Sequence, residues 1–315
     1  MKPTITILAL NILTITQMFG QPANLSFKLR NIAPDSVLRI MEQNAKAVFD
    51  EINNASRENR NLQFSTANIT SDGITNTLAL WAISKFQCVE PAYIENVTTN
   101  SYGGYQIRNI ATFFKDVEQS QDLVVDFDRA GKVSNISITI SKTQYSNIMQ
   151  TGSAVTDFRY RQIILDFIEN FHTAYYRQDV DFIEQVMFGN EIIIAGKKFH
   201  SGDDREAQNK QQYINKLRTA IMAKDSYGNK LNKLNVDFNK ISVIKSENGD
   251  EKLYLVRSWQ KWNSGNYSDE GWLSLIIDFQ NEQEPTIWVR AWQDASFKED
   301  ELYNFGHFYT SDAYK

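Results

Sequence analysis

The fold is decided by the stretch from Leu253 to Gln293, which reads LYLVRSWQKW at 253–262, GWLSLIIDF at 271–279 and PTIWVRAWQ at 285–293. β-Branched and aromatic residues fill all three segments, and polar residues that favour turns separate them. This pattern predicts a long antiparallel meander. Five of the six tryptophans of the chain lie within it.

Side chains of a strand alternate between its two faces. In the last segment, alternation predicts one face with Trp288, Arg290 and Trp292, and an opposite face with Ile287, Val289 and Ala291. In the first segment it separates Leu253, Leu255, Arg257 and Trp259 from Tyr254, Val256, Ser258 and Trp262. Neither face is plainly polar, so we expect both to be partly covered, one by helices and the other by a partner or a second domain. The tryptophans then either pack in the core and at an interface, or line an aromatic pocket with Arg257 or Arg290 as its cationic residue.

The chain has 315 residues, of which 42% are hydrophobic, 23% charged and 12% aromatic, and its formal net charge is −5. This is ordinary globular composition, and the length predicts about two domains. A negative net charge argues against nucleic acid as a partner, because nucleic-acid binding usually needs a basic surface. The single cysteine, Cys88, excludes an internal disulfide, so the core alone must stabilise the fold.

The N-terminus has the features of a secretory signal peptide. Lys2 supplies one positive charge, an apolar run extends from Thr4 to Ile15, and the small residue Gly20 lies near the expected cleavage position. The run is too short to span a bilayer, and no second hydrophobic stretch follows it. We therefore predict that residues 1–20 are a signal peptide and that the mature protein is soluble, without a membrane span, and exported to the periplasm or the cell exterior.

Residues 21–150 are expected to form a first domain. Apolar residues at helical spacing predict a helix from Val37 to Ile52, with Asp35 or Ser36 as its N-cap. Residues 74–86 fit either a short helix or a buried strand. A hairpin turn is expected at 128–131, where Gly131 can adopt positive φ. The expected strands are Tyr93–Thr98, Tyr105–Phe114, Gln121–Asp128 and Lys132–Ser141, and a linker at Gln150–Thr156 follows them.

Residues 151–315 are expected to form a second domain, which begins with a helix. The apolar stripe of this helix runs from Tyr160 to Tyr175. A shorter helix is expected at Asp179–Phe188, a strand at Glu191–Gly196 and a third helix at Asn209–Ala223. A strand at Val236–Ile244 then leads into the tryptophan-rich meander.

Two pairs of matching segments suggest an internal repeat. YQIR at 105–108 matches YLVR at 254–257, and LVVDFD at 123–128 matches LIIDFQ at 275–280. Both pairs have an offset of about 150 residues, as a tandem of two related α+β domains would give. The first copy is then the shorter and more degenerate one.

The second half resembles the nuclear transport factor 2-like cone fold, also called SnoaL-like and grouped with cystatin-like folds. FIENFHTAY at 167–175, DFIE at 181–184, IIIAG at 192–196, YSDEGW at 267–272 and WVRAW at 288–292 carry the resemblance. It is similar in particular to exported bacterial proteins of unknown function in which strands like those at Tyr105 and Asp126 precede such a domain. The resemblance implies an α+β chain of two cone-like domains, each with N-terminal helices packed on a curved antiparallel sheet.

The resemblance also implies candidate site residues, because related enzymes use an Asp, His or Tyr that points into the cone. His172, Tyr175, Tyr176, Asp278 and Arg290 are positioned to do so. No motif marks any of them as catalytic, and His172 fits a packed histidine while Asp278 fits a turn cap. With the aromatic strands, the candidate ligand-binding set is His172, Tyr175, Arg257, Trp259, Trp272, Trp288, Arg290 and Trp292.

The sequence contains no phosphate-binding glycine loop, no nucleophile elbow and no cluster of cysteines and histidines. His172, His200 and His307 are too scattered to predict zinc, so we expect neither a metal site nor a cofactor. Two functions are compared here, and the sequence does not separate either from a third, a purely structural or assembly role. The first is an exported protein that binds a small apolar or aromatic ligand, or an envelope protein, and forms a homodimer through the sheet face. The second is an isomerase or dehydratase of the SnoaL-like kind, with His172 or Asp278 as base and Tyr175 as hydrogen-bond donor.

Overall fold

The computed structural model describes residues 25–31, 34–151, 155–197, 209–222, 235–246, 252–264 and 267–309. The signal peptide expected at 1–20 and His200 lie outside these ranges. The chain divides into two compact units, one with residues up to 99 and 103–139, and the other with residues 100–102 and from 140 onward. None of the helices in the described ranges is long and apolar enough to cross a membrane.

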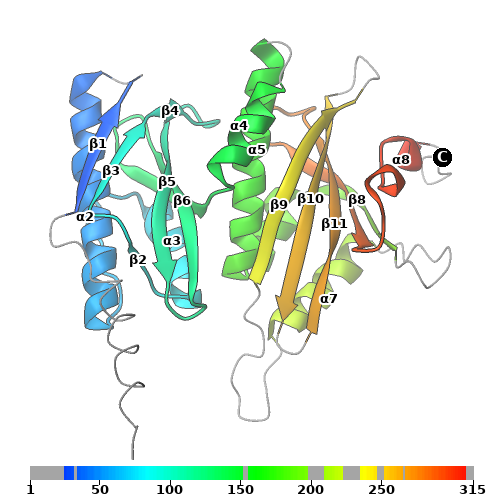
Figure 1. Ribbon diagram of the computed structural model, residues 1–315, viewed down its shortest axis with the longest axis horizontal. Coiled ribbons are helices and arrows are strands. Elements are labelled where there is room, and N and C mark those ends of the chain that lie inside the picture. The colour runs from blue at the N-terminus through cyan, green and yellow to red at the C-terminus, as the bar shows by residue number, and fades with distance from the viewer. Residues whose placement is uncertain are drawn as a thin grey trace, which may run out of the picture. The chain divides into compact units, whose positions relative to one another are not determined.

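The first unit begins with the strand β1 (Ser26–Arg30), which the sequence did not predict, and the helix α2 (Asp35–Glu58) (Figure 1). The predicted helix is confirmed, but it continues beyond Ile52 and its N-cap is Pro34, without a side-chain cap. It ends at Asn59, whose φ of 53° lies in the left-handed region that stops a helix. Its buried face carries Met41, Ala45, Val48, Phe49 and Ile52, which are among the apolar positions that predicted the helix, whereas Ile40 is exposed.

Residues 74–86, for which two interpretations were open, belong mainly to the helix α3 (Ser71–Ile83). Thr70 caps this helix, because its hydroxyl accepts a hydrogen bond from the Gly73 N–H at 3.1 Å. Gly73 allows close approach, since a Cβ there would lie 2.8 Å from Ile69 Cγ1 and 2.9 Å from the Val133 carbonyl oxygen. The last residue of the segment, Phe86, begins the short strand β2 (Phe86–Cys88).

The main sheet of the first unit has the strand order β2-β5-β6-β7, and all its pairs are antiparallel. The strand predicted at Tyr105–Phe114 is confirmed, whereas the one predicted at Tyr93–Thr98 is divided into two strands and the one predicted at Lys132–Ser141 ends at Ile138. Gly131 in the hairpin turn has a φ of 83°. A separate parallel pair joins β1 to β3. The strands are β3 (Ala92–Asn96), β4 (Thr98–Thr99), β5 (Tyr105–Phe114), β6 (Gln119–Phe127) and β7 (Val133–Ile138), with β4 paired to β5.

The second unit begins with a helix that the sequence did not predict, α4 (Lys142–Gln150), capped by the Ser141 hydroxyl. The linker expected at Gln150–Thr156 is therefore wrong at both ends, because α4 includes Gln150 and the long helix α5 (Val155–Arg177) includes 155 and 156. The predicted short helix is one turn, α6 (Val180–Phe182), followed by the π-helix η1 (Ile183–Met187). The third predicted helix is confirmed as α7 (Lys210–Met222).

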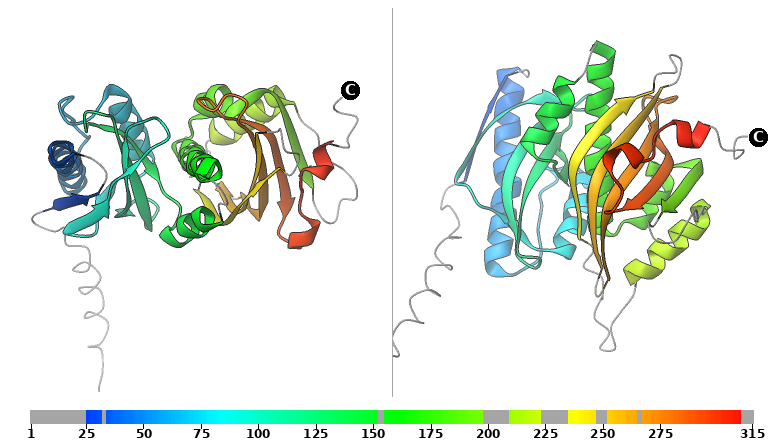
Figure 2. Two further views of the ribbon diagram at one scale, coloured as in Figure 1. Left: turned by 90° about the horizontal axis from the view of Figure 1, so that it is seen from above. Right: turned by 45° about the vertical axis from the view of Figure 1, so that its right-hand side comes forward.

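The sheet of the second unit has the order β8-β12-β11-β10-β9, in which the four later strands form the predicted antiparallel meander and β8 pairs in parallel with β12. The sheet curves around α5, and the C-terminal segment lies on its other side (Figure 2). The elements are β8 (Phe188–Lys197), β9 (Asn235–Lys245), β10 (Leu253–Ser264), β11 (Tyr267–Asp278), β12 (Thr286–Asp294), the 3-10 helix η2 (Glu299–Glu301) and α8 (Gly306–Tyr309).

We call the side of this sheet that faces α5 the inner face and the opposite side the outer face. The alternation predicted for β10 is confirmed, since Tyr254 and Val256 belong to the inner core while Leu253 and Leu255 belong to the outer cluster. The inner core unites residues of α5, η1, α7 and the sheet. The outer cluster unites sheet residues with Tyr303 and Phe308 of the C-terminal segment.

The alternation predicted for β12 is wrong at its start, because of a β-bulge. Ile276 pairs with Val289 but its neighbour Ile277 pairs with Ile287, so Trp288 is an extra residue in β12. Ile287 therefore belongs to the inner core, whereas Trp288 packs against the outer cluster with Val289. Arg290, which pairs with the inner-core residue Leu275, remains on the inner face.

The two units share an antiparallel meander after their helices, but the remaining strand is added differently. In the first unit β2 pairs with β5, the first long strand of the meander, and in the second β8 pairs with β12, the last one. The internal repeat therefore stays a prediction.

Candidate functional site

The inner face of the second unit holds a cluster of Arg290, Tyr175 and Tyr213, which come from β12, α5 and α7. The hydroxyl oxygens of Tyr175 and Tyr213 are 2.8 Å apart, within hydrogen-bond distance. The Arg290 guanidinium carbon lies 4.7 Å from the centroid of the Tyr213 ring, which is a cation–π contact. Tyr175 is 2% exposed and Arg290 is 8% exposed, whereas Tyr213 is only half-buried, so the cluster reaches the surface at Tyr213.

Burial and mutual proximity fix the charges of this cluster. Burial raises the pKa of Tyr175 well above its ordinary value, because it disfavours the phenolate. Burial acts to lower the pKa of Arg290, but its electrostatic interactions with Tyr213 and Tyr175 outweigh that effect, and the pKa is raised. At neutral pH the site therefore holds the Arg290 guanidinium cation beside the neutral phenol of Tyr175.

Arg290 has no carboxylate partner among the described residues. Its Nε atom is buried without a hydrogen-bond partner, and the groups that affect its pKa are the two tyrosines. A buried charge is normally paired, and Arg161 in the same unit shows this, since its Nε lies 3.1 Å from the buried Asp157 carboxylate. Among the described residues, the Arg290 cation is therefore stabilised by two tyrosines and not by a carboxylate.

A second unpartnered polar group and an open position lie on the same face. Gln260 is 3% exposed, and its Oε1 has no hydrogen-bond partner within the described ranges. Trp292 is half-buried and pairs with Gly196 of β8, two residues after Arg290. A Cβ on Gly196 would meet no described atom within 4 Å. Arg290, Gln260, Trp292 and Gly196 therefore share the inner face, and a small side chain added at Gly196 would meet no described atom.

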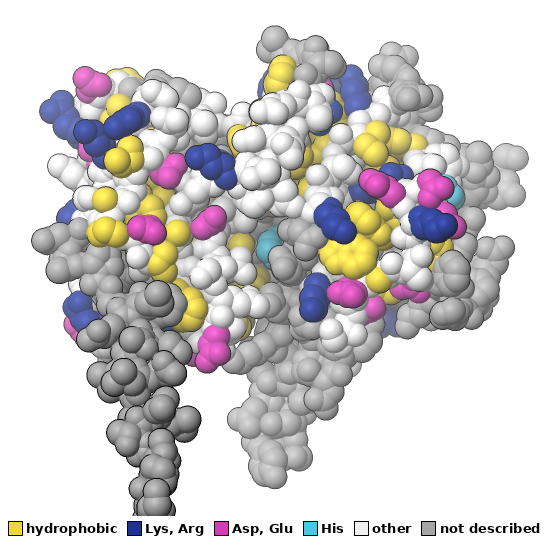
Figure 3. Space-filling view, viewed as in Figure 1, with side chains coloured by type: hydrophobic (Ala, Val, Ile, Leu, Met, Phe, Trp, Pro, Cys, Tyr) yellow, Lys and Arg dark blue, Asp and Glu magenta, His cyan; other side chains and the backbone are white. Residues whose placement is uncertain are grey.

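The other candidate residues on the strands lie on the outer face and do not join this cluster. Arg257 donates hydrogen bonds to the Tyr303 carbonyl oxygen from Nε at 3.1 Å and Nη2 at 2.7 Å, so it fastens the C-terminal segment. Trp259 and Trp272 form an edge-to-face pair at 5.2 Å, and the Lys240 ammonium lies 5.1 Å from the Trp259 ring. Figure 3 shows apolar side chains at the surface over β10 and β11, with basic and acidic groups beside them.

Of the candidate catalytic residues, Tyr175 belongs to the Arg290 cluster, but neither candidate base joins it there. Asp278 pairs with the outer-cluster residue Leu253 and accepts a hydrogen bond from the Gln280 N–H at 2.7 Å, so it caps a turn. His172 is buried on α5, but it is not among the groups that affect the pKa of Tyr175 or Arg290. Within the described ranges, no three His, Cys, Asp or Glu side chains gather into a metal site.

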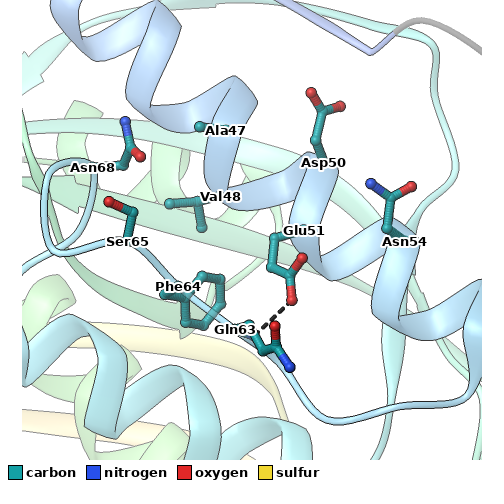
Figure 4. A pocket seen from close by; sticks show the side chains of 9 residues that line it. All are labelled: Ala47, Val48, Asp50, Glu51, Asn54, Gln63, Phe64, Ser65 and Asn68. Atoms are coloured by element: carbon teal, nitrogen blue, oxygen red, sulfur yellow. Dashed lines mark hydrogen bonds between the residues drawn. The ribbon is translucent and has the colours of Figure 1, made fainter.

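The first unit has a shallow pocket of about 280 Å³ between α2 and the loop that follows it (Figure 4). Glu51 stands at its edge and is already engaged, because it receives two hydrogen bonds from Arg60 at 2.6 and 2.9 Å and one from the Gln63 N–H. None of its lining side chains is buried without a partner. The lining residues are Ala47, Val48, Asp50, Glu51, Asn54, Gln63, Phe64, Ser65 and Asn68.

The order of elements in the second unit decides its fold: a long helix, a short helical turn, a strand, another helix and a curved antiparallel meander. The second unit has the nuclear transport factor 2-like cone fold. Because α5 and α7 lie against the inner face in this fold, the Arg290 cluster lies inside the cone. The chain is α+β, as predicted.

No family model and no curated protein matches the chain. Among solved structures it is similar to Bd1075 of Bdellovibrio bacteriovorus, with 14% identity, 54% of this chain and 46% of that chain covered, and a TM-score of 0.33. It is also similar to an NTF-2 like protein of unknown function from Shewanella oneidensis, with 14% identity, 42% of this chain and 96% of that chain covered, and a TM-score of 0.32. A third similar structure is the β subunit of a benzoate 1,2-dioxygenase from Burkholderia mallei, with 13% identity, 46% of this chain and 95% of that chain covered, and a TM-score of 0.33. At these TM-scores the similarities carry no weight for function, and less than half of Bd1075 is matched.

Three residues of the site were not predicted from the sequence. Tyr213 lies on a predicted helix, but it is 38 residues from Tyr175 and no spacing pairs the two. Gln260 and Gly196 were assigned to strands without a role. The usable signal was the polarity of Gln260, which follows Tyr254, Val256 and Ser258 on the inner side of an otherwise apolar strand.

Proposed function

We propose that this protein is an exported binding protein whose nuclear transport factor 2-like unit takes up a small molecule inside its cone. The observation that carries the proposal is the pair of buried, unpartnered polar atoms on the inner face, Arg290 Nε and Gln260 Oε1. Leaving such atoms unpaired costs about 1–3 kcal/mol each, and more for a charged group. A ligand that pairs with either atom recovers part of that free energy.

The space beside Gly196 and the half-buried Trp292 support an apolar or aromatic body for this ligand. Small-molecule sites in proteins are mostly apolar, with a few polar groups that fix orientation. Binding without chemical conversion agrees with the placement of Asp278 at a turn on the other side of the sheet. An enzymatic role would need a base near Arg290, and none of the described groups that act on it is one.

The test is native mass spectrometry of the full chain, purified without denaturant from the cell envelope. We compare the wild type with Gly196→Leu, which fills the open position of the cone, and with Lys240→Ala on the outer face as a matched control. A small molecule retained by the wild type and Lys240→Ala, but lost in Gly196→Leu, supports the proposal. A ligand-free protein in all three, or one bound only to another protein, overturns it.

Export is tested separately, by the intact mass of the protein recovered from the envelope fraction. Loss of about 20 residues from the N-terminus is expected if the signal peptide is cleaved. Recovery of the uncleaved chain from the cytoplasm would refute export while leaving the binding site untouched.

A further inference from the structure

The pocket of the first unit has room for a small ligand, and its lining suits one chemical class. Its volume of about 280 Å³ lies just below the range of about 300–1,000 Å³ that is usual for small-molecule sites, so it accommodates one small ring. One wall is the helix α2 and the other is the loop that contains residues 63–68 (Figure 4). All nine lining residues belong to the first unit, so this pocket is separate from the cone of the proposed function.

The charges around the pocket favour a neutral ligand. Both carboxylates of the lining already have cationic partners, since Asp50 pairs with Lys46 at 2.5 Å and Glu51 pairs with Arg60 at 2.6 Å. No lysine or arginine is among the lining residues that the structure describes. The pocket therefore has no unbalanced charge with which to hold a cation or an anion.

Side-chain amides supply hydrogen-bonding atoms that face this pocket. Asn68 donates from Nδ2 to Asn44 Oδ1 at 2.9 Å, which leaves its own Oδ1 as an acceptor. Asn54 accepts at Oδ1 from Arg57 at 2.6 Å, which leaves its Nδ2 as a donor. The exposed amide of Gln63 offers both functions. Hydroxyl groups, which donate and accept at the same atom, match this mixture of donors and acceptors.

A small apolar surface lies among these polar groups. Val48 is 1% exposed, and the half-buried Phe64 ring lies beside it (Figure 4). A face of a pyranose ring presents C–H groups that pack against such a surface, while its hydroxyl groups lie around the ring edge. Most small-molecule sites are mainly apolar, whereas six of the nine lining residues here are polar or charged. This lining suits a sugar better than an apolar compound.

The loop wall is fastened to the helix wall, so the pocket is preformed. Glu51 receives hydrogen bonds from both Nη atoms of Arg60 and, at 2.6 Å, from the Gln63 N–H. At the other end of the loop, Asn68 is held by Asn44, which is buried. A preformed site loses little conformational entropy when its ligand binds. We propose that this pocket binds a neutral pyranose, either as a free sugar or as the terminal unit of a glycan.

The experiment measures sugar binding to the full chain by saturation-transfer NMR and calorimetry. The neutral probes are the methyl glycosides of glucose, galactose, mannose and N-acetylglucosamine, added up to about 20 mM so that a Kd of about 1 mM gives near saturation. Glucosamine and glucuronate are the charged probes. We expect at least one neutral glycoside to bind and both charged sugars to bind more weakly, because the pocket has no charge to replace their lost hydration.

Two pairs of variants locate the binding. Gln63→Ala should weaken binding of the best glycoside about 5–10-fold, because it removes an amide from the pocket, whereas Gln43→Ala, at an exposed position of α2 outside the pocket, should not. Ala47→Phe fills the pocket and should abolish binding, whereas Ala82→Phe, at an exposed position of α3, should leave it unchanged. Circular dichroism and the urea midpoint establish that each variant is folded before binding is compared.

Binding of a neutral glycoside that is lost in Ala47→Phe and kept in Ala82→Phe establishes the site. A trisaccharide that ends in the same sugar then identifies the source, because tighter binding of the trisaccharide indicates a glycan and equal binding indicates a free sugar. Three results overturn the proposal: no glycoside binds, a charged sugar binds more tightly than every neutral one, or binding persists in Ala47→Phe. Equal affinities of Gln63→Ala and Gln43→Ala would also overturn it. None of these results depends on a ligand in the cone, so the proposed function is decided by its own test.

Discussion

Replacing Arg290 with methionine should leave the second unit as stable as the wild type, or make it more stable. The substitution removes a cation–π contact with Tyr213 at 4.7 Å, worth about 1–2 kcal/mol. It also removes the polar interactions with the two hydroxyls, worth about 1.5–3 kcal/mol. Against these losses, it removes the desolvation cost of a buried cation that has no carboxylate partner among the described residues, which is several kcal/mol. Methionine is close to arginine in length, and the tyrosines keep their mutual hydrogen bond at 2.8 Å. We expect a change in unfolding free energy within about 1 kcal/mol of zero, or stabilisation.

Urea unfolding followed by tryptophan fluorescence measures this change in the relevant unit, since five of the six tryptophans lie between 259 and 292. Arg257→Met is the matched control. It loses charge-assisted hydrogen bonds to the Tyr303 carbonyl oxygen and should be destabilised by about 2 kcal/mol. If Arg290→Met instead loses about 3 kcal/mol or more, as expected when one partner of a buried ion pair is deleted, Arg290 has a structural anionic partner. That result would refute the reasoning that Arg290 is a buried cation without an anionic partner.

Three further predictions concern other parts of the chain. Asp157→Asn should lower the unfolding free energy of the second unit, measured in urea, by about 3–5 kcal/mol, because it leaves the buried Arg161 without its carboxylate. Tyr254→Phe removes one 3.2 Å hydrogen bond to Asp157 and should lower the same free energy by about 1 kcal/mol. Equal effects of the two substitutions would count against a buried ion pair. Gly271→Ala should shift the urea midpoint strongly downward, because its Cβ would lie 2.2 Å from the Gln293 carbonyl oxygen, while Gly196→Ala should be tolerated. Burial raises the pKa of Cys88 to about 12, so the native thiol should react slowly with a disulfide reagent at pH 8 and rapidly in urea. The stability linked to this thiol is present below its unfolded pKa and is lost as the pH rises above it. Fast labelling of the native protein would contradict this prediction.

Regular apolar spacing is what made much of the fold predictable. The stripe from Tyr160 to Tyr175 predicted α5, and the alternation at 105–114 gave the bounds of β5. The helix α4 escaped because only Ile148 of its nine residues is buried, so it carries no apolar stripe. β1 was not predicted because its partner β3 lies more than 60 residues away in the chain, and no local sequence pattern indicates that pairing.

The site was only half predictable, for a related reason. Tyr175 and Arg290 were both candidates, but alternation alone placed Trp288 with them, and the bulge that moves Trp288 to the outer face depends on how β11 pairs with β12. Trp259, Trp272 and Arg257 were candidates by residue type, and the structure assigns them to the outer face. The pairing of strands, which decides these faces, is a long-range property that a single strand does not encode.

The C-terminal segment has a consequence for any protein that approaches the outer face of the sheet. Arg257 holds the Tyr303 carbonyl oxygen, Gln293 accepts from the Tyr303 N–H at 2.7 Å and donates to the Glu301 carbonyl oxygen at 3.1 Å, and Phe308 packs in the same cluster. A partner protein that binds this part of the outer face must displace the C-terminal segment, whose effective concentration at the face is of millimolar order because it belongs to the same chain. Removing residues 295–315 would expose this part of the outer face. The affinity of such a truncated chain for a partner would therefore be higher than that of the intact protein.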